Sequence, residues 1–462
     1  MDIEKQKDSH SLVFKMSVPI FIELLLQMLV GNVDQIMISH YSQNSVGAIG
    51  NANQILNIII IVLSVMSLAT TILISRYLGA KNKEKISEVL NTSLFLLTIA
   101  GIVITFVLFS FNTSIFSWMK VPVEIFFETS LYLMIVGAVT VIQGLYMGFA
   151  ATLRSYTLMK DVMLVAVIMN IINIIGNAIL INGLLGFPKL GIIGSALSTD
   201  ISRILGLFML IWIFYKKIDA EISWKYLKPF PVNTVKNILH LGVPSGVEQL
   251  SYNVSQIFIM KFTNFFGTIV ITTKVYCSMF IYIAYIYTIA LSEATQILVS
   301  YLLGANFLKK VNLRVWVTVG LSILISEVIT LLLYFNSDFV FGLLTKDPQI
   351  LELGHKILFV EIFLEFGRAI NIVMTRCLIA VEDTVFPAGM CIFSAWLFGV
   401  GAGYILGVKM GYGLVGIWAA MAVDECFRGI IFLFRFRYGK WWNRVHRKKL
   451  EDLRPRIIAN PL

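Results

Sequence analysis

Residues 58–74 read IIIIVLSVMSLATTILI and contain no charged side chain, and residues 94–109 read LFLLTIAGIVITFVLF. A helix needs about 20 mostly apolar residues to cross the hydrocarbon core of a bilayer, and both runs approach that length. Hydrophobic residues make up 58% of the 462 positions and charged residues 14%, against about 45–50% and about 25% in soluble domains. We therefore predict an all-α polytopic membrane protein.

Twelve apolar segments, separated by charges or by Gly, Asn and Pro, follow one another along the chain. Residues 1–11 lack the features of a signal peptide, so the first segment is expected to be retained. The predicted transmembrane helices cover 13–38, 47–75, 90–112, 127–152, 162–182, 192–215, 239–265, 268–302, 315–335, 351–376, 385–408 and 413–434. The expected organisation is a cytoplasmic tail at 1–12, an N-lobe at 13–215, a flexible cytoplasmic inter-lobe linker at 216–238, a C-lobe at 239–434 and a basic cytoplasmic tail at 435–462.

Lys and Arg are distributed very unevenly between the two sides of this arrangement. One set of alternate connections holds 27 of them and the opposite set holds 4. Cytoplasmic loops carry the excess of Lys and Arg, so both termini are predicted to be cytoplasmic in the inner (plasma) membrane. The net charge of +10 is then loop charge, and we expect no nucleic-acid partner.

The chain contains an internal repeat. Residues 18–25 (VPIFIELL) align with residues 243–250 (VPSGVEQL), and residues 74–80 (ISRYLGA) align with residues 299–305 (VSYLLGA), in both cases at an offset of 225. Each half has six expected helices. Because six is an even number, both copies enter the membrane from the same side. The sequence therefore predicts two pseudo-symmetric six-helix bundles related as parallel repeats.

Four polar residues of the first half form a candidate cation site. Asp34 lies in the first expected helix, Asn173 and Asn177 in the fifth, and Thr199 in the sixth. A charge at the bilayer centre costs about 3 kcal/mol or more, which makes Asp34 a functional candidate. Carboxylate, amide and hydroxyl oxygens suit a small hard cation, and a desolvated carboxylate suits a proton, so both Na⁺ and H⁺ fit. The alternative is that the Asn and Thr side chains only form hydrogen bonds between neighbouring helices.

The second half holds a candidate substrate site or second cation site. Glu248 lies in the seventh expected helix, and the tenth carries Glu361, Glu365 and Arg368 on one face. Tyr252 is one of many aromatic residues in the seventh and eighth helices, and its ring could hold a flat cationic compound. The alternative here is a static ion pair between Glu365 and Arg368.

No catalytic motif is found in the sequence. We find no His/Glu zinc pattern, no Gly-rich phosphate loop and no nucleophile elbow. We therefore expect that the protein is neither an enzyme nor an ATP-driven pump. We also expect that it binds no cofactor and no metal other than Na⁺ at the cation site.

A set of features recurs in a fixed order along nearly the whole chain. They are Pro19 with Asp34, Gly79-Ala80, Arg154, the segment from Gly191 to Ala196, Gly304-Ala305 and Arg376. In this order they resemble the multidrug and toxic compound extrusion (MATE) family. The resemblance implies two six-helix lobes around a central cavity that opens alternately to either side, with Na⁺-driven or H⁺-driven export of amphipathic, often cationic compounds.

The resemblance also implies roles for individual residues. Asp34, Asn173, Asn177 and Thr199 match the family's N-lobe cation site, although some relatives carry Asp at the position of Asn177. Relatives with a C-lobe site have an acid about eleven residues before the Arg that ends the tenth helix, and Glu365 fits that position.

Two other functions stay open at this point. One is a flippase for a lipid-linked substrate of the same superfamily, and the other is a non-transporting membrane assembly protein or a membrane enzyme. An exporter of the kind that the resemblance implies would have small-molecule substrates and the lipid bilayer as partners, and we expect a monomer.

Overall fold

The computed structural model describes residues 10–439 and residue 441, and within this part of the chain every regular element is a helix. The predicted all-α fold is confirmed. The outermost parts of the two predicted tails, residues 1–9 and 442–462, lie outside the described residues. The first-half helices are α1 (His10–Ser39), α2 (Gln43–Gly79), α3 (Lys83–Trp118), α4 (Val123–Ala138), α5 (Thr140–Ser155), α6 (Met159–Asn182) and α7 (Ile192–Lys217), with short 3-10 turns η1 (Leu184–Gly186) and η2 (Trp224–Leu227).

The second half follows the same plan. Its helices are α8 (Val232–Asn264), α9 (Thr268–Gly304), α10 (Leu308–Phe335), α11 (Ser337–Gly342), α12 (Pro348–Ala380), α13 (Val385–Ser394) and α14 (Gly413–Tyr438). Between α13 and α14 the chain continues as wider π-helical turns, η3 (Ala395–Ala402) and η4 (Tyr404–Lys409).

Many of these helices can span a bilayer. Among the described residues, eight are long and apolar enough, and α4 with α5, bent by 47°, make a ninth span when taken together. α8, α12 and α14 also lie where transmembrane helices are predicted, but they carry charged and polar residues along their middle. The protein is thus a multi-pass membrane protein, and the count of twelve crossings stays a prediction.

The helices form two compact units. The N-terminal unit is Val18–Gly246, and the C-terminal unit combines the described residues up to Ser17 with those from Val247 onward. The chain therefore passes from one unit to the other inside α1 and inside α8. Each passage lies next to a proline within the helix, Pro19 or Pro244.

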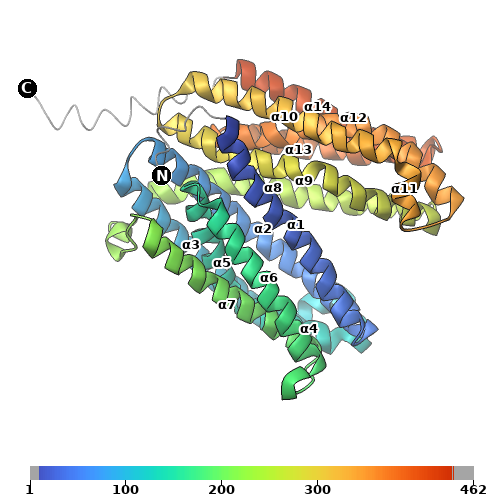
Figure 1. The fold of residues 1–462 in the computed structure, drawn as a ribbon, viewed down its shortest axis with the longest axis horizontal. Helices are drawn as coiled ribbons and strands as arrows, with labels where there is room; N and C mark the ends of the chain where they lie inside the picture. Colours follow the sequence, from blue (N-terminus) through green and yellow to red (C-terminus); the bar gives the residue numbers. More distant parts are fainter. Residues whose placement is uncertain (1–9, 440, 442–462) are drawn as a thin grey trace, which may run out of the picture. The chain divides into compact units, whose positions relative to one another are not determined.

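Each unit has an apolar core that orders its helices. In the N-terminal unit, α2, α3, α4 and α5 pack around Leu63, Leu97 and Leu133. In the C-terminal unit, α12 packs against α9, α10 and α14, near Val315 and Phe432 (Figure 1). This packing sets the charged faces of α12 and α14 against each other.

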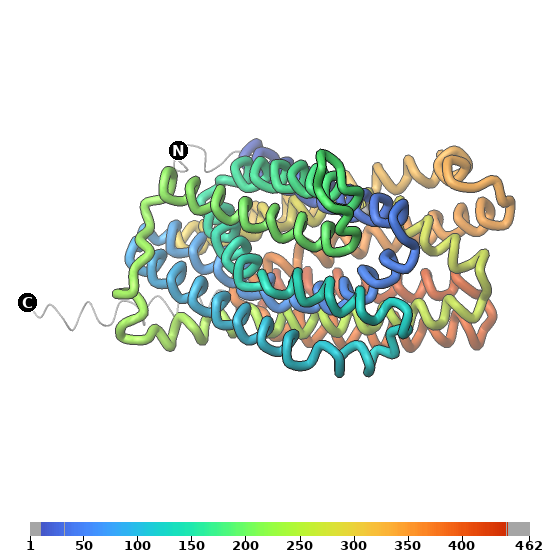
Figure 2. Tube along the Cα trace, turned by 90° about the horizontal axis from the view of Figure 1, so that it is seen from below, coloured from blue at the N-terminus to red at the C-terminus, as the bar shows by residue number. Residues whose placement is uncertain are grey.

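The connection between α7 and α8 is fastened to α3 of the same unit. Asn91 Nδ2 donates to Glu221 O (2.8 Å), and Ser223 N donates to Asn91 Oδ1 (2.9 Å). Glu221 N donates to Ser87 Oγ (3.1 Å). Figure 2 shows this connection in light green, running across the ends of neighbouring helices. These bonds limit the freedom expected of a flexible linker.

Candidate cation and substrate sites

The four residues predicted to form a cation site share one chain of hydrogen bonds, here called the Asp34 network. Asn177 Nδ2 on α6 donates to Asp34 Oδ1 on α1 (2.7 Å) and to Asn173 Oδ1 (3.4 Å). Asn173 Nδ2 donates to Thr199 Oγ1 on α7 (3.3 Å). Three helices of the N-terminal unit thus bring together a carboxylate, two amides and a hydroxyl.

Close packing of α6 against α7 holds this arrangement. A Cβ at Gly176 would lie 2.4 Å from Ser198 Oγ, so only glycine permits this approach. Ser198 Oγ donates to Asn173 O (2.8 Å), and Thr199 Oγ1 donates to Ser195 O (3.0 Å). The second bond turns the Thr199 oxygen so that it can accept from Asn173.

One oxygen of the Asp34 network has no partner. Both bonds of the Asn177 amide group leave from Nδ2 toward oxygen acceptors, which fixes the orientation of the amide. Its Oδ1 is buried and lacks a hydrogen-bond partner among the described residues. A buried polar atom without a partner costs about 1–3 kcal/mol. A small cation beside Asp34 would relieve that cost.

Glu23 belongs to a separate ion pair, although it lies on the same helix as Asp34. Its Oε1 lies 2.6 Å from Arg154 Nη2 on α5. The repeat at the offset of 225 relates Glu23 to Glu248, and Arg154 corresponds to Arg376 at a slightly shorter offset of 222.

The surroundings of the Asp34 network include three residues that are not in the predicted site. Tyr132 on α4 is buried beside Thr199, within electrostatic reach of Asp34, Asp200 and Arg203. Asp200 is buried, and its Oδ1 has no partner in the described part of the chain. The sequence carries a signal for Asp200 and Arg203, two charges inside an apolar helix, whereas nothing in it singles out Tyr132.

In the C-terminal unit, Glu361 and Glu365 are both bound by Arg368. Arg368 Nη1 lies 2.8 Å from Glu361 Oε1 and 2.8 Å from Glu365 Oε2. Glu361 Oε2 also accepts from Trp418 Nε1 (2.5 Å), and the Arg368 guanidinium lies 4.8 Å from the Tyr285 ring. The ion pair considered as an alternative for Glu365 is therefore present.

A second charged group lies on α14 and is absent from the predicted site. Arg428 Nη2 donates to Asp424 Oδ2 (2.9 Å) and Glu425 Oε1 (2.5 Å), and Asn371 Nδ2 of α12 donates to Glu425 Oε2 (2.6 Å). The sequence does indicate this group, because Asp424, Glu425 and Arg428 place three charges within five residues of an apolar segment. Their hydrogen-bond partner on α12, Asn371, could not be predicted from spacing along the chain.

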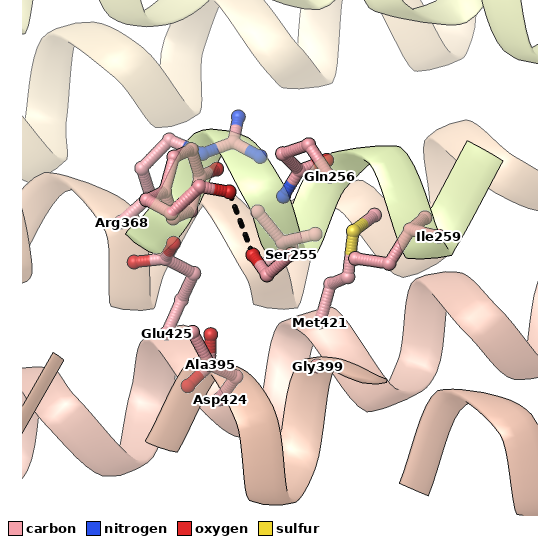
Figure 3. Close-up of a pocket in the computed structure, with 11 residues that line it drawn as sticks. Ser255, Gln256, Ile259, Arg368, Ala395, Gly399, Met421, Asp424 and Glu425 are labelled. Atoms are coloured by element: carbon pink, nitrogen blue, oxygen red, sulfur yellow. Dashed lines mark hydrogen bonds between the residues drawn. The ribbon is translucent and has the colours of Figure 1, made fainter. Parts of the chain in front are cut away.

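Part of this charged region borders a small cavity. Its empty volume is about 290 Å³, including space open to the outside. In Figure 3, Arg368 and Gln256 lie on the side of the cavity opposite Asp424, and the dashed line marks the bond from Ser255 Oγ to Tyr252 O. The lining residues are Tyr252, Ser255, Gln256, Ile259, Leu364, Arg368, Ala395, Gly399, Met421, Asp424 and Glu425.

Of the predicted C-lobe residues, only Tyr252 lines the cavity. Glu361 and Glu365 lie behind Arg368, and Glu248 is half-buried beside Cys391, with Arg428 and Arg376 among the nearby charges. The two ion-paired groups together are acidic, because four carboxylates are paired with two guanidiniums. The carboxylates are Glu361, Glu365, Asp424 and Glu425, and the guanidiniums are Arg368 and Arg428.

Comparison with known proteins places this geometry in context. The MatE family model matches residues 19–179 and again residues 244–405. The chain is 35% identical over 439 residues to the uncharacterized transporter YisQ of Bacillus subtilis, covering 95% of this chain and 96% of YisQ. It is 25% identical over 451 residues to the probable multidrug resistance protein NorM of Thermotoga maritima, covering 96% and 95% of the two chains.

Solved structures share the fold. A MATE crystal structure in the bent conformation matches with a TM-score of 0.87 at 21% identity, covering 94% of this chain and 96% of the other. A variant of the Vibrio cholerae MATE transporter VcmN matches with a TM-score of 0.86 at 18% identity, covering 93% and 96%. The double match to one family model confirms the internal repeat, and its two starts lie 225 residues apart, as the sequence predicts.

Proposed function

The chain belongs to the MatE family of membrane-embedded transporters, and from that premise we propose that it is a secondary active exporter of amphipathic, cationic small organic compounds. Na⁺ or H⁺ entering the cell drives export by alternating access. The relatives named as multidrug resistance proteins support an efflux role.

The Asp34 network is the observation that carries the coupling part of this proposal. Asp34 supplies a negative charge, and Asn177 Oδ1 supplies a buried oxygen without a partner. A bound Na⁺ or proton changes the charge of the network, and a ligand shifts a conformational equilibrium only by its differential affinity for the two states. Asp34 is therefore the residue through which an ion can favour one state of the transporter.

The acidic charge of the C-terminal unit supports a cationic substrate. Four carboxylates paired with two guanidiniums leave an excess of negative charge when all are ionised. A positively charged compound compensates that excess, whereas an anion would add to it. This sign of charge also disfavours a flippase that binds the diphosphate of a lipid-linked sugar.

The proposed site of action is the cell's inner (plasma) membrane, with both termini in the cytoplasm and the protein acting as a monomer. The uneven distribution of Lys and Arg supports this orientation. Efflux then moves compounds away from the side that carries the termini.

Reconstitution into proteoliposomes tests the proposal. Uptake of a fluorescent cationic dye is measured under a Na⁺ gradient, a pH gradient and, as a control, an equal K⁺ gradient, with protein-free liposomes alongside. We expect the Na⁺ or the pH gradient to drive dye accumulation and the K⁺ gradient to leave it at the level of empty liposomes. Accumulation under none of them, together with translocation of a labelled lipid-linked sugar, would favour the flippase.

A further inference from the structure

The cavity of the C-terminal unit holds one carboxylate oxygen that the protein leaves unused. Asp424 is 4% exposed and lines the cavity. Its Oδ2 accepts from Arg428 Nη2 at 2.9 Å, while its Oδ1 is buried and has no hydrogen-bond partner within the described chain. The Ser394 hydroxyl interacts with this carboxylate, but Oδ1 makes no hydrogen bond of its own, so it can still accept one from a further donor.

The other charged side chains around the cavity already form ion pairs or hydrogen bonds with one another. Glu425 accepts from Arg428 through Oε1 and from Asn371 through Oε2. Arg368, across the cavity, is bound to two glutamates. Within the described cavity lining, Asp424 therefore carries a carboxylate oxygen that takes no part in an ion pair.

The rest of the lining suits an amphipathic molecule. Ile259, Leu364 and Met421 provide apolar surface and Tyr252 an aromatic ring. The π-helix η3 packs beside α14 and lines the cavity through Ala395 and Gly399. A Cβ at Gly399 would meet only Asp424 Oδ2, at 3.8 Å. π-Helical turns occur often at functional sites. Here the turn presents a residue without a side chain beside the carboxylate.

We propose that Asp424 recognises the N–H group of protonated amines in this cavity, so that the protein binds an amine more tightly than the quaternary ammonium ion of the same shape. This inference rests on the proposed function and adds a rule of selectivity to it. A quaternary ammonium ion carries the same charge but has no N–H to donate. It leaves Asp424 Oδ1 without a hydrogen bond.

The test compares a fluorescent tertiary amine, at a pH where it is protonated, with its N-methylated quaternary analogue. Binding to purified full-length protein in nanodiscs is measured without any ion gradient. We expect the amine to bind about tenfold more tightly, because only the amine can donate a charge-assisted hydrogen bond, which is among the stronger hydrogen bonds in proteins. Asp424→Asn should weaken amine binding about tenfold and bring the two affinities close together.

Matched variants separate the site from general effects of charge and folding. Asp338→Asn removes an exposed acid of the same unit and should leave both affinities unchanged. Gly399→Ala should weaken both ligands by occupying the cavity. Gly403→Ala should not, because Gly403 follows η3 outside the cavity lining and an added Cβ would meet only Ala420. If Asp424→Asn fails to fold, the comparison of Gly399→Ala with Gly403→Ala still tests the location of the site.

Two results would overturn the inference. One is equal affinity of wild-type protein for the amine and its quaternary analogue, and the other is a preference for the amine that survives in Asp424→Asn. Failure of the proposed function is a different result, namely selective binding without gradient-driven transport in proteoliposomes. The binding assay and the transport assay therefore fail independently.

Discussion

At the scale of single residues, buried oxygens without partners mark the two candidate sites. Asn177 Oδ1 and Asp424 Oδ1 are each buried and unpartnered within the described chain. Asp34 was predictable because a carboxylate inside an apolar helix is costly. Asp424 had the same kind of signal, but sequence spacing tells only which residues share a face of one helix. It does not tell which faces of different helices meet, so neither Asn371 opposite Glu425 nor the cavity could be predicted.

Replacing Asp34 by Asn should abolish ion-coupled efflux while leaving expression near normal. The change removes the charge but keeps the size and an oxygen that can accept from Asn177. Efflux of a dye from cells, with and without Na⁺ and at several external pH values, measures the effect. Asp161→Asn is the control, because Asp161 pairs with Lys217 at 2.6 Å outside the network. Ion-coupled efflux at the wild-type level in Asp34→Asn would contradict the assignment of Asp34 to the ion site.

The C-lobe glutamates should differ in what they contribute. Both oxygens of Glu361 accept hydrogen bonds, from Arg368 and Trp418, whereas Glu365 Oε1 has no partner among the described residues. Glu361→Gln should lower the free energy of unfolding by about 2 kcal/mol, since hydrogen bonds to charged groups contribute roughly 1.5–3 kcal/mol each.

Glu365→Gln and Glu248→Gln should instead change ion or substrate affinity with a smaller loss of stability. Thermal unfolding in detergent and dye affinity in nanodiscs measure the two effects separately. Efflux kinetics at the wild-type level in both of these variants would make the C-lobe acids structural.

At the scale of helices, each predicted transmembrane segment falls on helical residues, but the sequence did not predict where each helix ends. α2 and α3 extend beyond the predicted 47–75 and 90–112 because they continue past the apolar stretch to polar caps. Ser42 Oγ accepts from Ser45 N (3.3 Å), and Asn82 Oδ1 accepts from Lys85 N (3.0 Å). Hydropathy follows the width of the lipid, whereas helix ends follow backbone hydrogen bonds.

The predicted helix 127–152 is broken between α4 and α5, with a bend of 47°. The Gly137 carbonyl oxygen accepts from the hydroxyls of Thr140 (2.7 Å) and Thr105 (3.0 Å). Hydroxyls that bond to main-chain carbonyls compete with the helical hydrogen bonds and bend helices. Thr140 is visible in the sequence as a helix-bending residue, but the contribution of Thr105 comes from another helix and could not be predicted.

Gly367→Ala should destabilise the C-terminal unit by forcing α12 away from α14. A Cβ at Gly367 would lie 2.4 Å from Cys426 N and 2.7 Å from Glu425 C, both main-chain atoms that cannot move alone. Overpacking of this kind costs about 1–3 kcal/mol. Loss of thermal stability, together with weaker dye binding as the bond between Asn371 and Glu425 lengthens, measures the effect.

The control is Gly320→Ala on α10, where an added Cβ meets nothing within 4 Å. Alanine is favoured over glycine in a helix by about 1 kcal/mol, so this variant should be neutral or slightly stabilising. An equal loss of stability in both variants would mean that close approach at Gly367 is not the cause.

At the scale of the whole molecule, the sequence repeat and the structural units begin at the same places. The two family matches start at residues 19 and 244, and the units divide after Ser17 and after Gly246. The start of α1 belongs to the C-terminal unit, where Ser17 Oγ lies 3.2 Å from Tyr287 Oη. The start of α8 belongs to the N-terminal unit, where Gly242 packs against Val65. The repeat predicted two similar bundles, but only contacts could show that each passage lies inside a helix.

These two passages should act as hinges during alternating access. A proline inside a helix removes one main-chain hydrogen bond and clashes with the preceding turn, so the helix bends easily there. Pro19 and Pro244 are related by the repeat and lie at the passages between units. Pro19→Ala and Pro244→Ala restore the missing N–H groups, and the double variant should slow or block the conformational change.

Spin labels at the expected extracellular ends of α1 and α8, introduced at His40 and Asn264 in a cysteine-free background, follow that change. In wild-type protein the distance distribution should respond to Na⁺ or to pH, because an ion that drives transport must favour one state. The response should be lost in Asp34→Asn and in the double proline variant. Pro348→Ala is the control, since Pro348 occupies the first turn of α12, where proline causes no bend. A response undiminished in the proline variants would place the hinges elsewhere, and one undiminished in Asp34→Asn would move the ion-sensing group to the glutamates of the C-terminal unit.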